Sequence, residues 1–421
     1  MEVKPGYKQT EVGVIPEKWD VKALSDVGHI RTGPFGTALK AAEYYASEGA
    51  PLVSVRDIGE GVLTFDEHTP LVPPAVVRRL PEYILNAGDI VFGRKGGVER
   101  SAMVRDDQAG CFLGSDGIRI RPSKDCHAPF ITYQFQRHEI QAWLLQNATG
   151  TTMASMNQGI LRRVSLPFPS KSEQRAIATA LSDVDGLLGE LDRLIAKKRN
   201  LKQAAMQQLL TGQTRLPGFH GEWEVKRLAQ IVDFANGKPH ESHIEATGQC
   251  NLITLDSIGI DGKLKTEHKP IGLLDNSLQK GDIVTILSDI AHGNLLGLCD
   301  LIPEDNIYVL NQRVGRLRVK PETQANPQFL RLQINRRQHH FKTRGQGTSQ
   351  RHIYRRHFDE LELALPKPDE QTAIAEALTE MDAELAALEQ RREKTRALKQ
   401  AMMQELLTGR TRLVPAGGSD A

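Results

Sequence analysis

Residues 173–216 read EQRAIATALSDVDGLLGELDRLIAKKRNLKQAAMQQLLTGQTRL, and residues 370–413 read EQTAIAEALTEMDAELAALEQRREKTRALKQAMMQELLTGRTRL. The two stretches align at a constant offset of 197 without a gap, and 25 of their 44 positions are identical. Such ungapped identity indicates an internal duplication, and a repeat of this kind decides the fold class. The chain therefore alternates a variable block with a conserved block, twice.

Both conserved copies show the apolar spacing of a long helix in a coiled coil. Steps of three and four place the apolar residues on one stripe of a helix. We expect Ser172 and Asp369 to be the N-caps and a Thr-Gly pair to end each helix. About 38 residues at 1.5 Å each give a rod of roughly 57 Å. The predicted seam residues are Ile177, Leu181, Val184, Leu188, Leu191 and Ile195 in the first copy, and Ile374, Leu378, Met381, Leu385 and Leu388 in the second.

A lone helix of this kind exposes its seam to water, so two near copies most simply bury their seams against each other. If a pseudo-two-fold axis relates the variable blocks, the helices form an antiparallel coiled coil with a block at each end. The alternative is that each helix packs on its own block as an element of a bundle. Both blocks contain short β-like runs broken by Gly, Pro and Asp, with a few helical patches. The predicted fold class is therefore α+β, with two mixed α/β domains separated by two long helices.

The repeat also predicts the domain boundaries. We expect a first variable domain at residues 1–168, a first conserved helix at 169–213, a second variable domain at 214–365, a second conserved helix at 366–410 and a C-terminal tail at 411–421.

Composition excludes several classes of protein. The chain has 54 Lys and Arg against 52 Asp and Glu, a net charge of +2, which excludes a uniformly basic nucleic-acid coat. No apolar run approaches 18 residues and the first residues lack the apolar core of a signal peptide, so we expect a cytoplasmic protein without a membrane span. The four cysteines are scattered without a C-x-x-C pair, which argues against a zinc ribbon or a disulfide scaffold.

The common catalytic motifs are absent from the sequence. We find no P-loop, no dinucleotide-binding G-x-G-x-x-G after a strand and no Asn-Pro-Pro-aromatic tetrapeptide of amino-methyltransferases. His240 and His243 lack an evident third ligand nearby, so we interpret them as loop histidines. Asp89 with Lys95 could belong to a nuclease-like triad, but the strand-end position of Asp89 favours turn capping. We therefore predict no catalytic residue and no metal site.

Basic residues are concentrated in one window of the second block. Residues 313–356 contain twelve Lys and Arg but a single acidic residue, Glu322, together with several Asn and Gln. Arginine contacts phosphates and guanine, while Asn and Gln pair with adenine. A solvated face or surface ion pair explains any one arginine. The whole cluster has too few acidic partners within the window, which favours nucleic acid as its partner.

The first block has a milder version of this pattern. Residues 94–100 form a Gly-rich basic loop, and residues 149–153 and 344–351 are Gly- and Thr-rich polar segments whose amides and hydroxyls can approach phosphates. The candidate nucleic-acid-binding residues are Arg94, Lys95, Arg100, Thr151, Thr152 and Asn157 in the first block, and Asn311, Arg313, Arg344, Gln346, Thr348, Ser349 and Arg351 in the second.

These patterns together resemble the specificity subunit of type I restriction–modification systems. The resemblance rests on YKQTEVGVIPEKW at residues 7–19, GPFG at 33–36 and GDIV at 88–91. Above all it rests on the paired EQxAIA and LKQxxMQxLLTG patterns of the two conserved helices. A duplicated helix joined to two unlike blocks is a far more specific signal than any of the short motifs.

The resemblance implies two target recognition domains, each reading one half of a bipartite, asymmetric sequence in double-stranded DNA through the major groove. It implies that the helices set the gap between the half-sites and dock two modification subunits, which hold S-adenosylmethionine and methylate adenine. A restriction/translocase subunit with ATP and Mg²⁺ would cut the DNA. On this view the chain itself is non-catalytic and binds no cofactor.

Two further expectations concern surfaces. Gln174, Lys197 and Arg199 are identical to their mates Gln371, Lys394 and Arg396, and we interpret all six as exposed positions that serve a common partner. The second block opens with FANGKP at residues 234–239 where the first has GPFG, so its recognition surface should differ. The alternatives are a self-sufficient DNA-modifying enzyme with fused recognition domains, and a structural coiled-coil linker that does not touch DNA.

Overall fold

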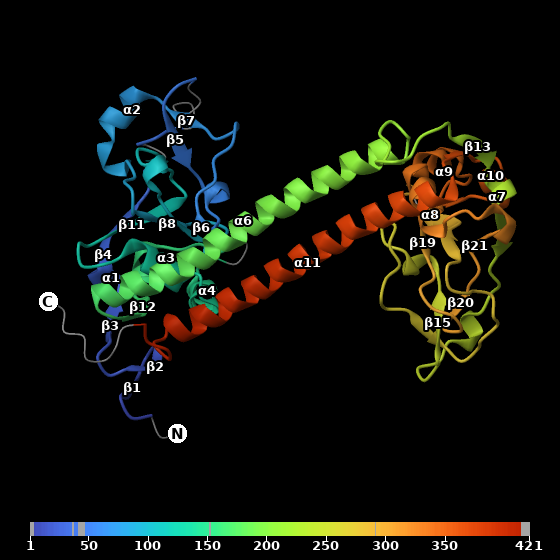
Figure 1. Ribbon diagram of the computed structural model, residues 1–421. Helices are drawn as coiled ribbons and strands as arrows, with labels where there is room; N and C mark the ends of the chain where they lie inside the picture. The colour runs from blue at the N-terminus through green and yellow to red at the C-terminus, as the bar shows by residue number, and fades with distance from the viewer. Residues whose placement is uncertain (1–3, 36–37, 41–46, 151–152, 291, 414–421) are drawn as a thin grey trace. The chain divides into compact units, whose positions relative to one another are not determined.

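The computed structural model describes residues 4–35, 38–40, 47–150, 153–290 and 292–413, which divide into two compact units (Figure 1). Unit 1 contains residues 1–192 and 390–421, and unit 2 contains residues 193–389. Two helices of 39 residues each, α6 (Lys171–Leu209) and α11 (Pro368–Leu406), belong partly to each unit. The two predicted long helices are therefore confirmed.

The ends of these helices differ slightly from the prediction. The Ser170 backbone carbonyl accepts the first helical hydrogen bond of α6, from the Gln174 amide, and the Lys367 carbonyl accepts the Gln371 amide in α11. The predicted N-caps, Ser172 and Asp369, are wrong by two residues, because both lie inside the first turn. The predicted glycine endings are confirmed: Gly212 and Gly409 have φ of +70° and +73°, a backbone conformation that favours glycine after a helix.

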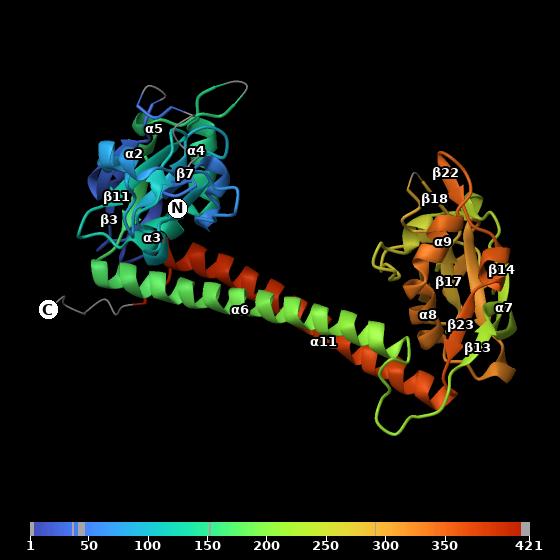
Figure 2. The same ribbon diagram turned by 90° about the horizontal axis from the view of Figure 1, so that it is seen from above.

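Unit 1 is a mixed α/β domain whose described strands form two main sheets and two further sheets of two strands each (Figures 1 and 2). The larger has the order β4-β11-β8-β9-β6, and the smaller has the order β10-β5-β7, in which β10 and β5 are parallel. These strands are β4 (Gly28–Thr32), β11 (Gly117–Pro122), β8 (Ile90–Gly93), β9 (Ser101–Met103), β6 (Glu60–Val62), β10 (Phe112–Leu113), β5 (Ala50–Val53) and β7 (Leu71–Val72). The remaining elements are β1 (Tyr7–Thr10), β2 (Gly13–Pro16), β3 (Asp20–Ala23), β12 (Ser165–Phe168), α1 (Leu24–Val27), α2 (Pro74–Arg79), α3 (Ala128–Phe135), α4 (His138–Asn147) and α5 (Gln158–Arg162).

Unit 2 likewise combines a larger sheet with a three-stranded sheet, but its larger sheet has four strands where that of unit 1 has five. Its two main sheets have the orders β14-β21-β17-β19 and β16-β15-β20, with β15 and β20 parallel, and its described strands form two further sheets of two strands each. These strands are β14 (Val232–Asn236), β21 (Val314–Val319), β17 (Ile283–Ile286), β19 (Cys299–Leu301), β16 (Lys269–Ile271), β15 (Cys250–Ile253) and β20 (Tyr308–Leu310). The remaining elements are β13 (Glu224–Arg227), β23 (Glu362–Leu365), β18 (Ser288–Ile290), β22 (Gln350–His352), α7 (Leu228–Ile231), α8 (Pro327–Arg336), α9 (Gln338–Arg344) and α10 (Arg355–Asp359).

A charge pair stabilises the same place in both sheets. Asp89, next to β8, accepts two hydrogen bonds from the Arg121 guanidinium at 2.7 and 2.8 Å, and Asp282, next to β17, accepts two from Arg318 at 2.7 Å. Asp89 also accepts the Asn86 backbone N–H at 2.8 Å, so the turn-capping interpretation of this residue is confirmed. Bidentate pairing of this kind is stronger than a neutral hydrogen bond and holds the two side chains in one geometry.

The ends of the long helices are built into the domain cores. In unit 1, Ile177 and Leu181 of α6 and Leu406 of α11 lie in one apolar cluster with Trp19 and Phe130 of the domain. In unit 2 the corresponding cluster joins Ile374 and Leu378 of α11 to Leu209 of α6, Phe329 and Phe341. Burial of apolar surface therefore anchors both helices to both domains.

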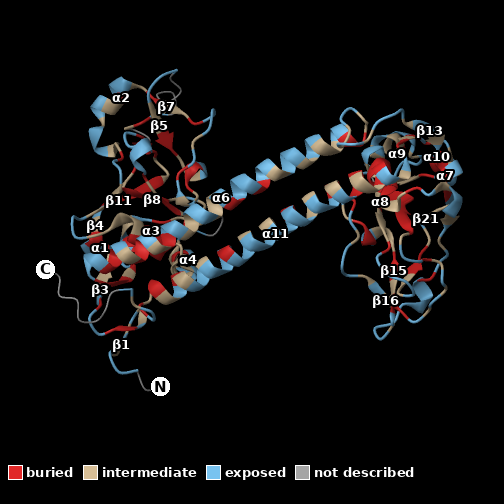
Figure 3. Cartoon of the chain, viewed as in Figure 1, coloured by how far each residue is buried: buried red, intermediate tan, exposed pale blue. Residues whose placement is uncertain are grey.

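Between these anchored ends, α6 and α11 are mostly exposed or half-buried (Figure 3). Leu191, Ile195 and Leu385 are buried there, and Val184, Leu188, Met381 and Leu388 are half-buried. Ion pairs join the two helices: Asp185 to Lys399 at 2.7 Å and Asp192 to Arg392 at 3.3 Å in unit 1, and Lys198 to Glu384 and Lys202 to Asp382, both at 2.6 Å, in unit 2. In each unit the partner number falls as the α6 number rises, so the helix segments run antiparallel, as predicted.

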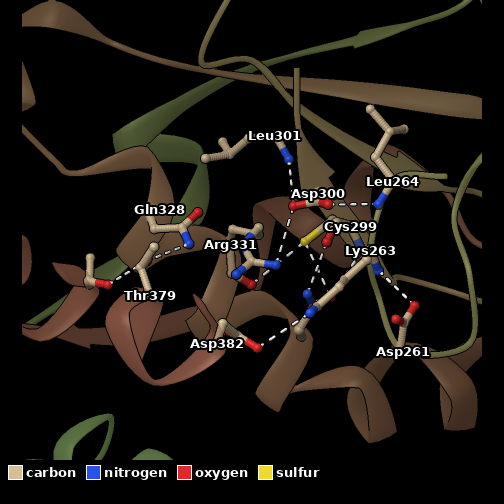
Figure 4. A network of polar contacts seen from close by, with 12 residues as sticks. Asp261, Lys263, Leu264, Cys299, Asp300, Leu301, Gln328, Arg331, Thr379 and Asp382 are labelled. Atoms are coloured by element: carbon tan, nitrogen blue, oxygen red, sulfur yellow. Dashed lines mark hydrogen bonds and ion pairs between the residues drawn. The ribbon is translucent and has the colours of Figure 1, made fainter. Parts of the chain in front are cut away.

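Figure 4 shows how α11 is tied to the domain of unit 2 by polar contacts. The Lys263 ammonium lies 3.3 Å from the Asp382 carboxylate, and Gln328 donates a hydrogen bond to Thr379 at 3.2 Å. Behind them, buried Arg331 pairs with Asp300 at 3.2 Å. In unit 1, Tyr133 of α3 donates instead to Asp185 at 2.8 Å. The equivalent aspartates Asp185 and Asp382 thus share an equivalent lysine from the other helix, Lys399 or Lys202, but differ in the domain side chain that binds them, Tyr133 or Lys263.

No helix within the described ranges has the length and apolar composition needed to cross a bilayer.

Candidate nucleic-acid interface

The predicted basic loop of unit 1 lies against the polar segment that follows α4. The Arg94 backbone carbonyl accepts the Met156 amide at 2.8 Å, the Gly96 amide donates to the Ala154 carbonyl at 2.9 Å, and Lys95 forms a β-bridge with Ser155. The backbone therefore brings Arg94 and Lys95 to residues 154–157.

Two of the predicted residues line one open hollow of about 690 Å³ on unit 1. Arg94 and Asn157 face it, and Asn157 also caps α5 by accepting the Ile160 amide at 3.0 Å. Arg100, by contrast, lies beside Glu99 at 3.6 Å and is not among the lining residues. Thr151 and Thr152 lie outside the described residues. The full lining is His29, Ile30, Arg31, Thr32, Phe35, Tyr83, Arg94, Asn157, Gln158, Gly159 and Arg162.

The hollow also contains side chains outside the list of candidate binding residues, of which the sequence marked Arg162 only as one of the basic residues of this block. Arg31 and Arg162 add two cations, and the Arg31 guanidinium lies 5.7 Å from the centre of the Tyr83 ring. Phe35 is 60% exposed and packs against the Arg94 guanidinium at 5.0 Å. Phe35 is part of the GPFG motif, which was the only feature of the sequence that could have marked it as a residue of this surface. Arg31 and Tyr83 carried no signal, because these residues, 52 positions apart in the chain, meet only through the fold.

Unit 2 builds an equivalent surface from the same backbone contacts. The Leu287 amide donates to the Arg313 carbonyl at 3.0 Å and the Leu287 carbonyl accepts the Ile353 amide at 2.8 Å, which matches the pattern at Arg94. Strands β18 and β22 then pair, with Asp289 opposite Arg351. Arg313 is thereby placed beside the polar segment at residues 344–351, in which Arg344, Gln346, Thr348 and Ser349 are exposed.

Two of the predicted residues in unit 2 have structural partners. Asn311 is 3% exposed; its side chain accepts the His240 amide at 3.1 Å and donates to Glu241 at 2.9 Å. The hydrogen bond from Asn311, together with one from Gln312, lowers the pKa of Glu241 to about 2. Arg351 donates to the Gly345 carbonyl at 2.8 Å and is half-buried. Arg313 has a φ of +68° and an exposed side chain.

The charge count of the sequence overstated the free positive charge in residues 313–356. Acidic partners come from outside that window: Asp282 binds Arg318, Asp300 binds Arg331 and Asp359 binds Arg355. The argument that the cluster has too few partners was therefore wrong for these arginines. Within the described part of the chain, the ion pairs do not include the half-buried Arg316, nor Arg313, Arg336, Arg337, Lys342, Arg344, Arg351 or Arg356, so a smaller basic surface remains.

The expectation that Gln174 and Gln371 are exposed was also wrong. They are 1% and 3% exposed, each donates to a proline carbonyl (Pro169 or Pro366) at 2.9 Å, and each accepts a backbone amide of its own domain. Their identity between copies therefore has a packing reason. Lys197, Arg199, Lys394 and Arg396 are exposed as expected.

The histidine pair has ordinary partners. The His240 ring lies 3.1 Å from the Asp275 carboxylate and His243 lies 3.2 Å from the Ser242 hydroxyl. Over the described residues, no group of three or more metal-ligating side chains comes together.

Comparison with known proteins gives a consistent result. Residues 16–198 and 220–397 each match the family model of the type I restriction modification DNA specificity domain. The MjaVIII specificity subunit of Methanocaldococcus jannaschii is 25% identical over 95% of this chain and 94% of its own length. The StySPI specificity subunit of Salmonella potsdam is 24% identical over 68% of each chain.

Solved structures share the fold. The type I S subunit of M. genitalium superposes with a TM-score of 0.59 at 15% identity, covering 97% of this chain and 98% of that one. The HsdS subunit of Thermoanaerobacter tengcongensis gives 0.52 at 16% identity, covering 94% and 98%. With both domains matched by the family model and the fold shared over nearly the whole length, this chain belongs to the family of type I restriction–modification specificity subunits.

Proposed function

We propose that this chain is the non-catalytic subunit that reads a bipartite, asymmetric target in double-stranded DNA, with one half-site for each domain. The observation that carries the proposal is the equivalence of the two surfaces: the same backbone contacts hold Arg94 and Leu287, yet the side chains around them differ. A shared framework with unlike side chains is what two different half-sites require, because phosphate contacts position a reader and base contacts specify the sequence.

A salt titration tests the DNA-binding part of the proposal. Binding of a duplex by the full chain should weaken steeply with salt, and each phosphate-contacting arginine should contribute a slope of about 0.9. Arg313→Ala and Arg344→Ala should each lower the slope by about 1 and weaken all sequences alike. Glu362→Ala, an exposed position on β23, is the matched control. A slope near zero for the unaltered chain would refute DNA binding and favour a purely structural linker.

A domain exchange tests the bipartite reading. Replacing residues 20–165 by the equivalent block of another family member should change one half of the methylated sequence in host DNA and leave the other half as it was. A change in both halves contradicts independent recognition by the two domains.

We further propose that the long helices set the spacing of the half-sites and dock two modification subunits, and that a restriction/translocase subunit joins the complex. S-adenosylmethionine, ATP and Mg²⁺ would then bind those partners and not this chain. The support is the burial of Leu191, Ile195 and Leu385 between segments that also carry exposed, repeated cations such as Lys197 and Lys394.

The helix proposal predicts the effect of two charges placed at seam positions, half-buried Leu188 and buried Leu385. Leu188→Asp combined with Leu385→Asp should separate the helices and abolish assembly with the modification subunits, measured as the mass of the complex by size-exclusion chromatography with light scattering. Leu201→Asp, at a position that is 48% exposed, places the same charge on α6 and should leave assembly intact. Full assembly of the double variant would contradict the helix proposal.

A self-sufficient DNA-modifying enzyme is the second candidate. Transfer of a labelled methyl group from S-adenosylmethionine to DNA by this chain alone would establish it, whereas we expect transfer only after modification subunits are added.

A further inference from the structure

Unit 1 presents an aromatic ring to solvent with an arginine fixed behind it. Phe35 is 60% exposed, and the Arg94 guanidinium lies 5.0 Å from its ring centre. Arg94 is itself held by backbone contacts: its guanidinium donates to the Ser115 carbonyl at 3.2 Å and its amide donates to the Asp116 carbonyl at 2.7 Å. One face of the ring is thus covered by a positioned cation, an arrangement stabilised by the ring quadrupole.

An isolated exposed phenylalanine needs no functional explanation. Here, however, the ring borders the hollow that also contains Arg31 and Arg162, and the described residues lining this hollow include no carboxylate. One of its cations has an acidic partner outside the lining, since Glu82 lies 3.7 Å from Arg31. An apolar ring among cations suits a ligand that offers both negative charge and apolar groups, as a DNA groove does.

Unit 2 does not place an exposed aromatic residue at the equivalent position. The Gly33 amide donates to Gly117 at 2.9 Å and the Gly237 amide to Val314 at 3.0 Å, so the two glycines match and Phe35 corresponds to Pro239. The exposed aromatic of unit 2 is Tyr354, 48% exposed, beside the Arg356 guanidinium at 5.4 Å. The chemistry at Phe35 therefore belongs to one domain and to one half-site.

We propose that Phe35 is a specificity-determining residue that contacts the C5 methyl group of a thymine in the half-site read by the first domain; this rests on the DNA-reading function proposed above. Phenylalanine makes apolar contacts with the thymine methyl group in the major groove. Insertion between base pairs would use both faces of the ring, and Arg94 covers one of them. The free face and edge remain for a methyl group.

The experiment compares thymine with deoxyuridine, which lacks only that methyl group. The target is first obtained by mapping methylated adenines, and binding of the full chain with its modification subunits is measured by fluorescence anisotropy. Replacing the thymines of one half-site by deoxyuridine should weaken binding about fourfold in one of the two halves, the equivalent of one buried methyl group. Phe35→Ala should bind thymine and deoxyuridine duplexes equally.

Two control variants separate the role of Phe35 from DNA binding in general. Arg100→Ala, outside the hollow, should weaken both duplexes by the same factor and keep the fourfold preference. Tyr354→Ala should leave the thymine preference of the Phe35 half-site unchanged. Loss of salt-dependent duplex binding by the unaltered complex would refute the proposed function, whereas intact binding without the thymine preference would refute only the role of Phe35.

Two other outcomes also overturn the proposal. The first is a thymine preference that survives in Phe35→Ala. The second is a rise in 2-aminopurine fluorescence within that half-site on binding that disappears in Phe35→Ala, because unstacking of the base would show insertion of the ring instead of a methyl contact.

Discussion

Trp19 and Trp223 occupy equivalent places at the start of the two domains but have different polar partners. The Trp19 indole N–H donates to the buried Glu173 carboxylate at 3.0 Å, and Arg412 also binds Glu173. Glu370, the mate of Glu173, binds Arg215, but the buried Trp223 N–H has no partner among the described residues. The duplicated framework has thus kept the ion pair in both units and the indole hydrogen bond in only one.

The largest expected effect comes from removing the shared carboxylate. Glu173→Ala removes the buried acceptor of hydrogen bonds from Arg412 and Trp19, and it leaves the Trp19 N–H without a partner. The two effects together should lower the free energy of unfolding by about 3–5 kcal/mol. Glu370→Ala strands no indole, so its effect should be smaller by about 1–3 kcal/mol. Chemical denaturation of the full chain measures both values.

Conservative tryptophan variants provide the control for this difference. Trp19→Phe should be clearly more destabilising than Trp223→Phe, because only the first removes a hydrogen bond. Equal losses for the two carboxylate variants would show that the indole bond in unit 1 contributes nothing.

The ion pairs Asp89–Arg121 and Asp282–Arg318 should contribute equally to the stability of the two units. Asp89→Ala and Asp282→Ala each remove two hydrogen bonds to an arginine from a carboxylate that is 1% exposed. We expect each to lower the free energy of unfolding by about 2–3 kcal/mol. A difference of more than about 1 kcal/mol between the two would contradict an equivalent framework.

Substitutions of Asn311 and Arg313, two residues apart in the candidate interface, should have different effects: one on stability and the other on DNA binding. Asn311→Ala removes the partner of the His240 amide and of Glu241, and should lower the melting temperature. Arg313→Ala removes an exposed side chain and should leave the melting temperature unchanged while weakening DNA binding. Thermal denaturation and anisotropy on the same samples test this. Unchanged DNA binding in Arg313→Ala with a lowered melting temperature would reverse the assignment.

The smallest effect concerns acid stability of the helix contact in unit 2. Burial alone would raise the pKa of Asp382, but hydrogen bonding to Lys202 and the charges of Lys202 and Lys263 lower it below its ordinary value of 3.8. A carboxyl group with a lowered pKa in the folded state stabilises the fold above its unfolded pKa, and that stability is lost as the pH falls through the folded pKa.

Asp382→Asn should therefore lower stability at neutral pH and flatten the loss of stability below about pH 4. The measurement is the melting temperature from pH 7 to pH 2. Glu376→Gln, an exposed position on α11, is the control and should follow the unaltered chain. Parallel curves for Asp382→Asn and the unaltered chain would show that the contact does not contribute.

The amphipathic helices were predictable because their information is local. The period of three and four residues specifies α6 and α11, and glycine specifies their ends through the left-handed φ at Gly212 and Gly409. Strands such as β8 and β17 were predictable for the same reason, since short apolar runs that follow Gly and Asp already favour them. The N-caps were misplaced because several polar residues adjoin each start.

The candidate site was predictable only in part. The basic loop and the polar segment were found by composition, and the backbone does bring residues 94–96 to 154–156. Asn311 looked like an interface residue in the sequence, and only its contacts with His240 and Glu241 reveal a structural role. The boundaries proposed for the domains and the DNA-contacting residues remain predictions.

The sequence by itself determined that the long helix is duplicated, because the ungapped identity between residues 173–216 and 370–413 indicates a duplication whatever the fold. The tertiary structure decided which charges are available, because an ion pair depends on distance in space and not along the chain. Asp282 neutralises Arg318 and Asp300 neutralises Arg331 from outside the basic window, while Arg31 and Phe35 join Arg94 at one surface. The periodicity of a helix depends only on residues that are neighbours in the sequence. The partners of a charge or an aromatic ring depend on which distant residues the fold brings close together.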